Sequence, residues 1–284
     1  MALQRALTRS TGLATRALGI RGAHEGTTHV VIGGCSGSGV GSVLARSLAR
    51  SGATVVVTSR SEEKATGFAS ELQELAGSNA AAGMQCDASD ASSVEAALKK
   101  ARELSPSNAV DGVVNTCGSV LLKPAHTTSD SDFDATMDAN VKTAFATVKA
   151  AAKQKKAAGS NGMSIALCSS TVALHGVPNH EAIAAAKGAV ISLARSAACT
   201  YASSNLRFNA VAPGLTRSPI TYKITESEQA ANSSKQMHAI KRLGEPTDVS
   251  SALSFLLDPA NSWITGIAIP IDGGLSSVYA SSSS

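Results

Sequence analysis

The chain has 284 residues, of which 43% are hydrophobic and 16% are charged, with a formal net charge of +4 at pH 7. This length and composition favour one globular domain, or at most two small ones. The five cysteines are scattered and never form a Cys-x-x-Cys pair, which argues against a zinc site and against a secreted disulfide framework. No apolar run reaches the roughly 18 residues that a membrane span requires, so we expect a soluble protein.

The N-terminal segment, residues 1–25, is basic and amphipathic. It contains four arginines and no acidic residue before Glu25, and on a helix Arg5, Arg9 and Arg16 fall on one face. Such a segment predicts an organellar transit peptide, mitochondrial rather than plastid, with a disordered tail as the alternative. Loss of the four arginines reduces Lys+Arg from 25 to 21, equal to the 21 Asp+Glu. We therefore expect a neutral mature protein without the basic surface that binds nucleic acid.

From His29 onward, short apolar segments alternate with longer helical patterns. Segments rich in Val, Ile and Ala without strict alternation are typical of strands buried on both faces of a parallel sheet. We therefore predict strands at 29–33, 54–59, 82–86, 110–115, 164–169, 207–212 and 267–271. The stretches between them predict helices at 40–51, 62–76, 91–104, 130–157, 180–203 and 247–257.

This repeated strand–helix alternation predicts the fold class. It indicates a single doubly wound Rossmann-type α/β domain over residues 26–278, with a parallel seven-stranded sheet and helices on both faces. Residues 214–245 are rich in Ser, Thr and Lys and predict a mobile loop or a helical flap after the sixth strand. The final residues, 279–284, predict a disordered tail.

A glycine-rich turn follows the first predicted strand. The sequence IGGCSGSGVGS has glycines at 33, 34, 37, 39 and 41. Glycines between a strand and a helix let the backbone approach a pyrophosphate, which the N–H groups and the positive dipole end of the helix then bind. An ordinary tight turn is the alternative, but the position between a strand and a helix favours dinucleotide binding. The candidate cofactor-binding residues of this turn are Gly33, Gly37, Ser38, Gly39 and Val40.

The residue that follows the second predicted strand indicates which dinucleotide binds. Arg60 stands about where an NAD-binding fold has an Asp or Glu that bonds the ribose 2′-hydroxyl. A guanidinium there favours a 2′-phosphate, so we expect NADP(H) rather than NAD(H). The alternative is a solvated surface arginine.

Further segments match, in order and spacing, the motifs of a known family. The third predicted strand ends in QCDASD, the fourth in NTCG and the fifth in CSS, and the sixth leads into NAVAPGLTRSPI. The segment MDANVKTAF lies in the predicted helix 130–157, and Lys187 lies in the alanine-rich helix after the fifth strand. From His29 to about Leu275 the sequence resembles a short-chain dehydrogenase/reductase of the single-domain, 3-oxoacyl-reductase-like type.

The resemblance implies roles for individual residues. It implies a catalytic asparagine, serine and lysine at Asn140, Ser170 and Lys187, and the lysine also binds the nicotinamide ribose. Purely structural roles for Asn140 and Ser170 remain the alternative. The further cofactor contacts that it implies lie in the turns at the strand ends: Asp87, Ala88, Asn115, Gly118, Pro213, Gly214 and Ser218.

Three features depart from the family pattern. The glycine turn fits the family's TGxxxGxG only with one inserted residue; we take Gly33 as its first glycine, with Ile32 in place of threonine, although an alignment from the helix side would place it at Cys35. The family's Asn-Asn-Ala-Gly turn is Asn-Thr-Cys-Gly at 115–118. The family's proton-donating tyrosine, four residues before the lysine, is Ile183 in this chain.

The isoleucine leaves the reaction without its usual proton donor. A carbonyl that receives a hydride becomes an alkoxide and needs a proton. His180 shares a helix face with Ile183 and Lys187, and a histidine of ordinary pKa near 6.5 is a competent acid. We therefore take His180 as the candidate donor, with an exposed first-turn residue as the alternative. Weaker candidates are Tyr222, His175 and Glu181.

Together these residues predict an NADP(H)-dependent oxidoreductase of the mitochondrial matrix that acts on a carbonyl or enoyl substrate with a non-standard proton donor. The alternative is a catalytically inactive, nucleotide-binding scaffold or complex subunit. The family implies a homotetramer packed through the helices 130–157 and 180–203. We expect a small-molecule carbonyl or acyl substrate and no metal. The neutral charge and the few aromatic residues (Trp 1, Tyr 3, Phe 5) disfavour an RNA-binding module.

Overall fold

The computed structural model describes residues 23–35, 37–77, 80–154 and 162–278. All but the last three residues of the expected transit peptide lie outside this part of the chain. The expected tail at 279–284 also lies outside the described residues.

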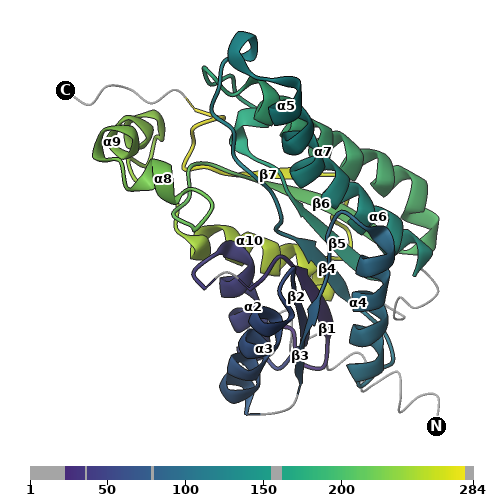
Figure 1. The fold of residues 1–284 in the computed structure, drawn as a ribbon. Coiled ribbons are helices and arrows are strands. Elements are labelled where there is room, and N and C mark those ends of the chain that lie inside the picture. The colour runs from purple at the N-terminus through teal and green to yellow at the C-terminus, as the bar shows by residue number, and fades with distance from the viewer. Residues whose placement is uncertain (1–22, 36, 78–79, 155–161, 279–284) are drawn as a thin grey trace.

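A parallel sheet of seven strands forms the centre of the fold (Figure 1). Its order is β3-β2-β1-β4-β5-β6-β7, and every neighbouring pair is parallel. Each predicted strand is present, and its bounds differ from the prediction by at most two residues. The strands are β1 (Thr28–Ile32), β2 (Thr54–Ser59), β3 (Ala81–Gln85), β4 (Gly112–Asn115), β5 (Met163–Cys168), β6 (Leu206–Pro213) and β7 (Ala268–Ile271).

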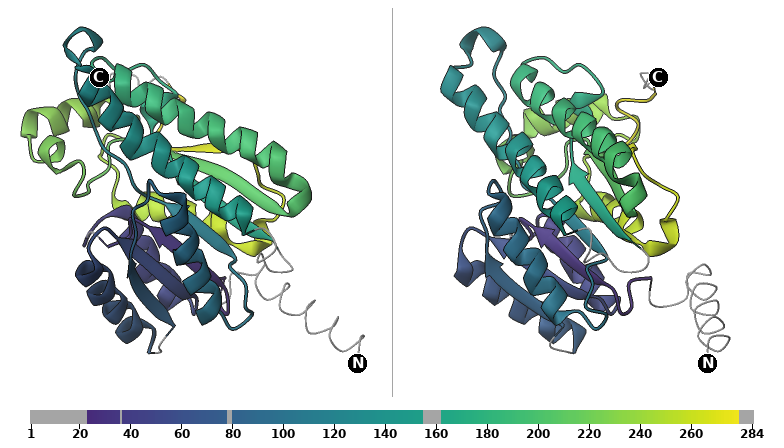
Figure 2. Two further views of the ribbon diagram at one scale, coloured as in Figure 1. Left: turned by 45° about the vertical axis from the view of Figure 1, so that its right-hand side comes forward. Right: turned by 90° about the vertical axis from the view of Figure 1, so that its right-hand side faces the viewer.

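Helices cover both faces of the sheet (Figures 1 and 2). One face packs on α2 (Val40–Arg50), α3 (Glu62–Ala76) and α10 (Pro246–Leu257). The other face packs on α4 (Ala91–Leu104), α6 (Thr143–Lys153) and α7 (Glu181–Tyr201). This arrangement confirms the predicted doubly wound Rossmann-type fold.

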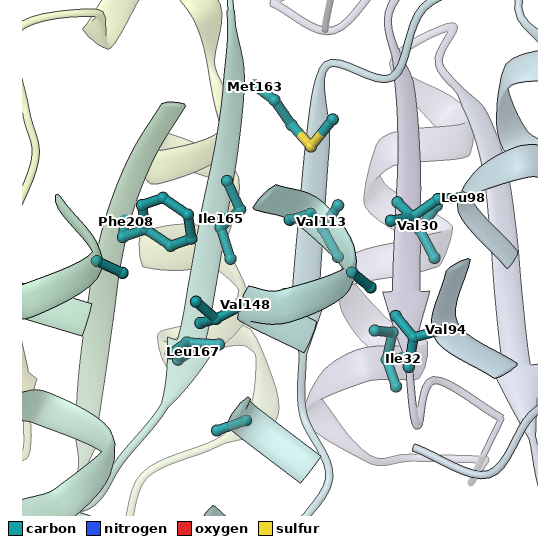
Figure 3. Packing of buried hydrophobic residues seen from close by; sticks show 14 of the residues in the cluster. Val30, Ile32, Val94, Leu98, Val113, Val148, Met163, Ile165, Leu167 and Phe208 are labelled. Carbon is teal, nitrogen blue, oxygen red and sulfur yellow. The ribbon is translucent and has the colours of Figure 1, made fainter. Parts of the chain in front are cut away.

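Side chains alternate between the two cores because successive residues of a strand point to opposite faces. In β1, Val30 and Ile32 join the core under α4, α6 and α7, whereas Val31 joins the core under α2, α3 and α10. Figure 3 shows the first of these cores, where Val113 and Ile165 continue the apolar layer across the sheet. Burial on both faces explains why the strands read as nearly unbroken apolar runs.

The predicted helix 130–157 is not continuous. It consists of α5 (Asp130–Met137), a π-helical turn at Asp138–Lys142 and α6, which ends at Lys153. The prediction of one regular helix is therefore wrong, because the π turn takes up an extra residue at the position of Asn140. Gln154 follows α6 with φ −87° and ψ 10°, outside the helical region.

The helix α7 qualifies the expectation that no apolar run could span a membrane. Within the described residues, Glu181–Ser204 is long and apolar enough to do so, with a mean hydropathy of 1.3. Half of its most apolar window is buried inside the protein. Val190, Ile191 and Ala194 pack in the sheet core, so this is a core helix of the domain.

The segment after β6 contains two short helices, α8 (Tyr222–Thr225) and α9 (Glu228–Met237). They lie apart from the sheet, on the left of Figure 1. This is the helical alternative predicted for residues 214–245, and we call α8 and α9 the flap.

The buried His24, which packs against the buried His29 of β1, extends the packed unit upstream of the expected domain boundary at residue 26. The Nε2 atom of His24 lies 2.8 Å from the hydroxyl of Ser254 on α10. The Nε2 atom of His29 lies 2.8 Å from the Thr27 hydroxyl, and the two imidazole rings meet edge to face with centroids 5.1 Å apart. The folded unit therefore includes residues that the sequence assigned to the transit peptide.

We expect the stability of the protein to fall in mild acid because of His29. Burial, reinforced by the neighbouring His24, holds the pKa of His29 well below its ordinary range. The unfolded chain takes up this proton below about pH 6.5, whereas the folded chain does not. Because the unfolded state then binds more protons, the free energy of unfolding decreases as the pH falls below about 6.5.

Urea denaturation between pH 7.5 and pH 5 measures this loss. The variant His29→Gln should show a smaller decrease over the same range, whereas the exposed His126→Gln should follow the wild type. An unchanged decrease in His29→Gln would show that other groups cause the acid sensitivity.

Candidate active site

The parallel strands bring the predicted site residues to one edge of the sheet. Their carboxyl ends all meet there, which is where doubly wound folds bind ligands. The glycine turn follows β1, Arg60 follows β2, Asp87 follows β3, and Ser170 follows β5. Residues far apart in the sequence therefore surround one edge.

The glycine turn leads from β1 into α2 without an inserted residue. Gly33 and Gly37 have φ values of +81° and +57°, which favour glycine. Gly39 is the N-cap residue and α2 begins at Val40, so the spacing from Gly33 through Gly37 to Gly39 fits TGxxxGxG directly. The expected insertion is wrong because Gly41 belongs to the helix and not to the turn.

The turn forms a cradle that suits a pyrophosphate. A Cβ atom on Gly33 would lie 2.7 Å from Cys117 Sγ, and one on Gly41 would lie 2.5 Å from Thr116 Oγ1. Gly39 has no side chain to cap α2, so backbone N–H groups are presented at the positive end of the helix dipole. Gly37 and Ser38 are exposed at the tip of the turn. These residues fit a dinucleotide.

Two polar residues stand at the adenosine end of the cradle. Arg60 is exposed directly after β2, where its carbonyl accepts a hydrogen bond of 3.0 Å from Gln85 Nε2. Asp87 Oδ1 accepts hydrogen bonds from the backbone N–H and the hydroxyl of Ser89, at 2.9 and 2.8 Å. These bonds lower the pKa of Asp87. The next residue, Ala88, is buried.

The Asn-Thr-Cys-Gly turn after β4 is held by its asparagine. Asn115 Oδ1 accepts a hydrogen bond of 2.8 Å from the Cys117 N–H, and its Nδ2 donates to Thr147 Oγ1 at 2.9 Å. Gly118 then approaches the catalytic candidates. A Cβ atom at Gly118 would lie 2.8 Å from Asn140 Oδ1 and 3.1 Å from Lys187 Nζ. The amide and the ammonium therefore converge beside this turn.

Asn140 is buried in the π turn and held from two sides. Its Nδ2 donates to the Thr136 carbonyl at 2.8 Å and to the Ser119 hydroxyl at 3.0 Å, while its Oδ1 accepts from the Ser119 N–H at 3.2 Å. The Asn140 amide thus bonds both a carbonyl of its own helical segment and Ser119 of the turn after β4.

Lys187 is a buried ammonium on α7. Its Nζ donates a hydrogen bond of 2.9 Å to the Cys168 carbonyl, and its own carbonyl accepts from the Ser169 hydroxyl at 2.8 Å. Burial lowers the pKa of Lys187. Burial also raises the pKa of the Cys117 thiol to about 12 and that of Cys168 to about 11, so both stay protonated beside the lysine.

Ser170 lies between the ends of β5 and β6. Its hydroxyl is 3.5 Å from the Pro213 carbonyl and accepts from the Val172 N–H at 3.4 Å. Both bonds are long, so the hydroxyl is weakly engaged. One helical turn before Lys187, Ile183 is buried.

His180 is the N-cap residue of α7, and its Nδ1 lies 2.7 Å from the Pro178 carbonyl. Among the hydrogen bonds of the described residues, this histidine bonds Pro178 and neither Ser170 nor Lys187. The structure thus brings Asn140, Gly118 and Lys187 together, whereas it leaves the candidate donor at the entrance of the helix.

The segment beyond β6 is fixed against the end of β7. A Cβ atom on Gly214 would lie 2.5 Å from His238 Nε2 and 3.1 Å from the Cα atom of Asp272. Asp272 accepts a hydrogen bond of 2.8 Å from Thr171 Oγ1. The Ser218 N–H donates to Thr221 Oγ1 at 3.1 Å. A pocket of about 500 Å³ lies beside this segment.

Comparison with known proteins agrees with this geometry. Residues 33–276 match a family model described as Enoyl-(Acyl carrier protein) reductase. A short-chain type dehydrogenase/reductase from Mycobacterium ulcerans has a solved structure with a TM-score of 0.81 and 29% identity, covering 89% of this chain and 90% of that one. The chain belongs to the short-chain dehydrogenase/reductase family.

The descriptions of two further similar proteins name a substrate in one case and a cofactor in the other. Galactitol 2-dehydrogenase (L-tagatose-forming) from Cereibacter sphaeroides is 32% identical over 84% of this chain and 91% of its own length. The solved structure of ElxO with NADP bound has 28% identity and a TM-score of 0.77, covering 89% of this chain and all of that one. The chain is therefore a member of a family of NAD(P)-dependent oxidoreductases.

Several supporting residues of this family member were not found from the sequence. Ser119 bonds both ends of the Asn140 amide, and its position next to Gly118 was the only available signal. Arg46 donates to the Gly37 carbonyl at 2.7 Å and so holds the glycine turn. The Cys168 carbonyl that accepts the hydrogen bond of Lys187 is a backbone group, so no residue type in the sequence indicates it. Within the described residues no group of His, Cys, Asp and Glu is arranged to hold a metal ion.

Proposed function

We propose that this protein is an NADP(H)-dependent oxidoreductase that transfers hydride between the nicotinamide and a carbonyl or enoyl substrate, with His180 as proton donor. The observation that carries the proposal is the convergence of Asn140 Oδ1 and Lys187 Nζ beside Gly118, at the edge of the dinucleotide cradle. Among the described residues the Lys187 ammonium forms no ion pair with a carboxylate, and a buried charge without such a partner is costly unless it serves binding or catalysis.

The bound dinucleotide supplies or accepts the hydride. Lys187 binds the ribose of the dinucleotide. Together with Asn140 it conducts protons to the site. The Ser170 hydroxyl, weakly bonded in the protein, turns to the substrate oxygen. The Pro178 carbonyl can only accept a hydrogen bond, so Nδ1 of His180 carries a hydrogen and Nε2 is the atom that transfers the proton.

The second candidate function is a nucleotide-binding scaffold without turnover. It is favoured by Ile183, which is 3% exposed and fills the position of the family's phenol with a packed aliphatic side chain. NADPH affinity of the intact chain, followed by NADPH oxidation with a panel of carbonyl and enoyl compounds, separates the two. Binding without turnover, combined with a gain of reductase activity in Ile183→Tyr, would refute the relocated donor.

We expect Arg60→Asp to shift cofactor preference from NADPH toward NADH. A charge-assisted hydrogen bond contributes about 1.5–3 kcal/mol, so the ratio of the two affinities should change about 10- to 100-fold. Titration of each dinucleotide by fluorescence measures the ratio. Arg50→Asp, on the far end of α2, makes the same change of charge and should leave the ratio unaltered. An unchanged ratio in Arg60→Asp would reject the role of the arginine.

We further propose a homotetramer in the mitochondrial matrix. The assembly is supported by Phe145 on α6, which is half exposed and lines a groove with Val148 and Tyr201 between α6 and α7. These helices lie side by side in Figure 2. The location is supported by the basic N-terminal segment. Sedimentation of the purified chain should give four times the monomer mass, and a monomer would reject the assembly.

A further inference from the structure

Exposed apolar side chains lie on the segments that follow β4, β5 and β6, four of them on loops and Tyr222 at the start of α8. Their exposed fractions are 39% for Val120 and 43% for Leu122, 40% for Leu174, and 50% for Ile220 and 61% for Tyr222. The three strands are neighbours in the sheet and their carboxyl ends share one edge (Figure 1). We call these five residues the apolar rim. Adjacent exposed apolar residues mark a binding surface, whereas isolated ones do not.

The apolar rim borders the reacting groups. Val120 follows Gly118 by two residues, and a Cβ atom on Gly118 would meet both the amide of the π turn and the buried ammonium. Leu174 follows Ser170 by four residues, at the end of the short helical turn that this serine begins. Ile220 lies in the turn between β6 and the flap. We therefore expect a molecule bound at the serine to reach the rim with its remaining atoms.

Two serines next to the apolar rim, Ser119 and Ser218, are already bonded within the protein. The hydroxyl and N–H of Ser119 both bond the Asn140 amide. The hydroxyl and N–H of Ser218 both lie within 3.1 Å of Thr221 Oγ1. A polyol presents several hydroxyl groups, and a site that selects it must offer polar groups that are not already satisfied.

The cations of these loops are largely neutralised. Lys123 Nζ lies 2.6 Å from Asp132, and Arg217 Nε lies 3.4 Å from Glu245. Lys223, on α8, is the third Lys or Arg of the loops 116–129, 169–180 and 214–227. Two of the three are thus paired with carboxylates, which disfavours a carboxylate substrate that would need a cation for itself.

We infer that the substrate is an uncharged carbonyl compound whose apolar chain or ring packs on the apolar rim, and not a sugar, a polyol or a carboxylate. The inference rests on the proposed function and names the substrate class of that site. It separates this chain from the Cereibacter relative named for galactitol.

A series of 2-alkanones from butanone to decanone tests the inference, with NADPH oxidation by the intact chain as the readout. Each methylene buried on the rim should raise kcat/KM about three- to fourfold until the rim is covered. A ketohexose and a 2-oxo acid should be poorer substrates than butanone. The inference would be overturned if kcat/KM did not change with the chain length of the alkanone, or if kcat/KM were higher for a ketohexose than for decanone.

Variants locate the effect. Leu174→Asn and Ile220→Asn should flatten the dependence on chain length while NADPH affinity is kept. Trp263→Asn removes an apolar side chain that is 99% exposed before β7, away from the rim, and should keep the wild-type dependence. If all three substitutions changed the dependence on chain length equally, the rim would not be the surface that binds the apolar chain.

A measurement of ligand binding that does not require turnover tests the substrate class separately from the proposed function. If no carbonyl compound is reduced, the proposed function fails, and thermal unfolding of the NADPH-saturated protein still reports on the rim. Stabilisation by decanone and not by the ketohexose supports an apolar ligand, and the reverse result overturns the inference.

Discussion

Replacing His180 by alanine is expected to lower kcat by about 10²- to 10⁴-fold, the usual contribution of general acid–base catalysis. The imidazole stands at the start of α7, with Nδ1 fixed by the Pro178 carbonyl, so Nε2 is the transferring atom. Ile183 has no ionisable proton to donate. Burial raises the pKa of the Cys117 and Cys168 thiols, so these thiols do not release their protons readily. NADPH affinity should be unchanged because the proposed dinucleotide contacts are at the glycine turn and Lys187, and not at His180.

The control is His126→Ala, which removes an exposed imidazole from the loop between β4 and α5. It should retain wild-type kcat. Full activity in His180→Ala would show that this histidine is not the proton donor. A loss of NADPH affinity together with the loss of kcat would indicate a structural role instead. Steady-state NADPH oxidation and equilibrium titration together distinguish these results.

Gly83→Ala is expected to destabilise the fold by about 3 kcal/mol or more, at the upper end of the cost of overpacking. Gly83 lies in the middle of β3, where a Cβ atom would run into the carbonyl group of Ala65 on α3. The obstacle is backbone, which cannot rotate away as a side chain can, so helix and strand must separate. The midpoint of urea unfolding measures the loss.

Gly67→Ala is the matched control on α3 itself. A Cβ atom at Gly67 meets nothing within 4 Å, and alanine favours a helix over glycine by about 1 kcal/mol. This variant should be as stable as the wild type or more stable. A Gly83→Ala protein as stable as Gly67→Ala would show that β3 and α3 can part without cost.

The strands and most helices were predictable because their signals are local. Val, Ile and Ala runs buried on both faces define the strands, and the candidate roles of the glycine turn and Arg60 follow from position relative to those strands. The role of Lys187 was assigned from the resemblance to the family. The π turn at Asp138–Lys142 was not predictable, because the same residues suit a regular helix and the bonds of Asn140 to the distant Ser119 leave no local signal.

Other features depend on contacts between distant segments. The pairing of His24 with Ser254 joins residues at opposite ends of the chain, and nothing near His24 in the sequence indicates it. The supposed insertion in the glycine turn arose because Gly41 reads as part of the turn, whereas it is the second residue of α2. Sequence alone could not decide where that helix begins.

The strand order also determines how the sheet can be assembled in time. β2 pairs with β1, β3 with β2, β4 with β1, and each later strand with the one directly before it. Every strand therefore finds its neighbour already made when the chain leaves a ribosome N-terminus first, so the sheet can widen outward from its centre during synthesis. The glycine turn between β1 and α2 therefore leaves the ribosome long before Lys187 on α7, and the segment after β6, with Gly214 and Ser218, follows later still.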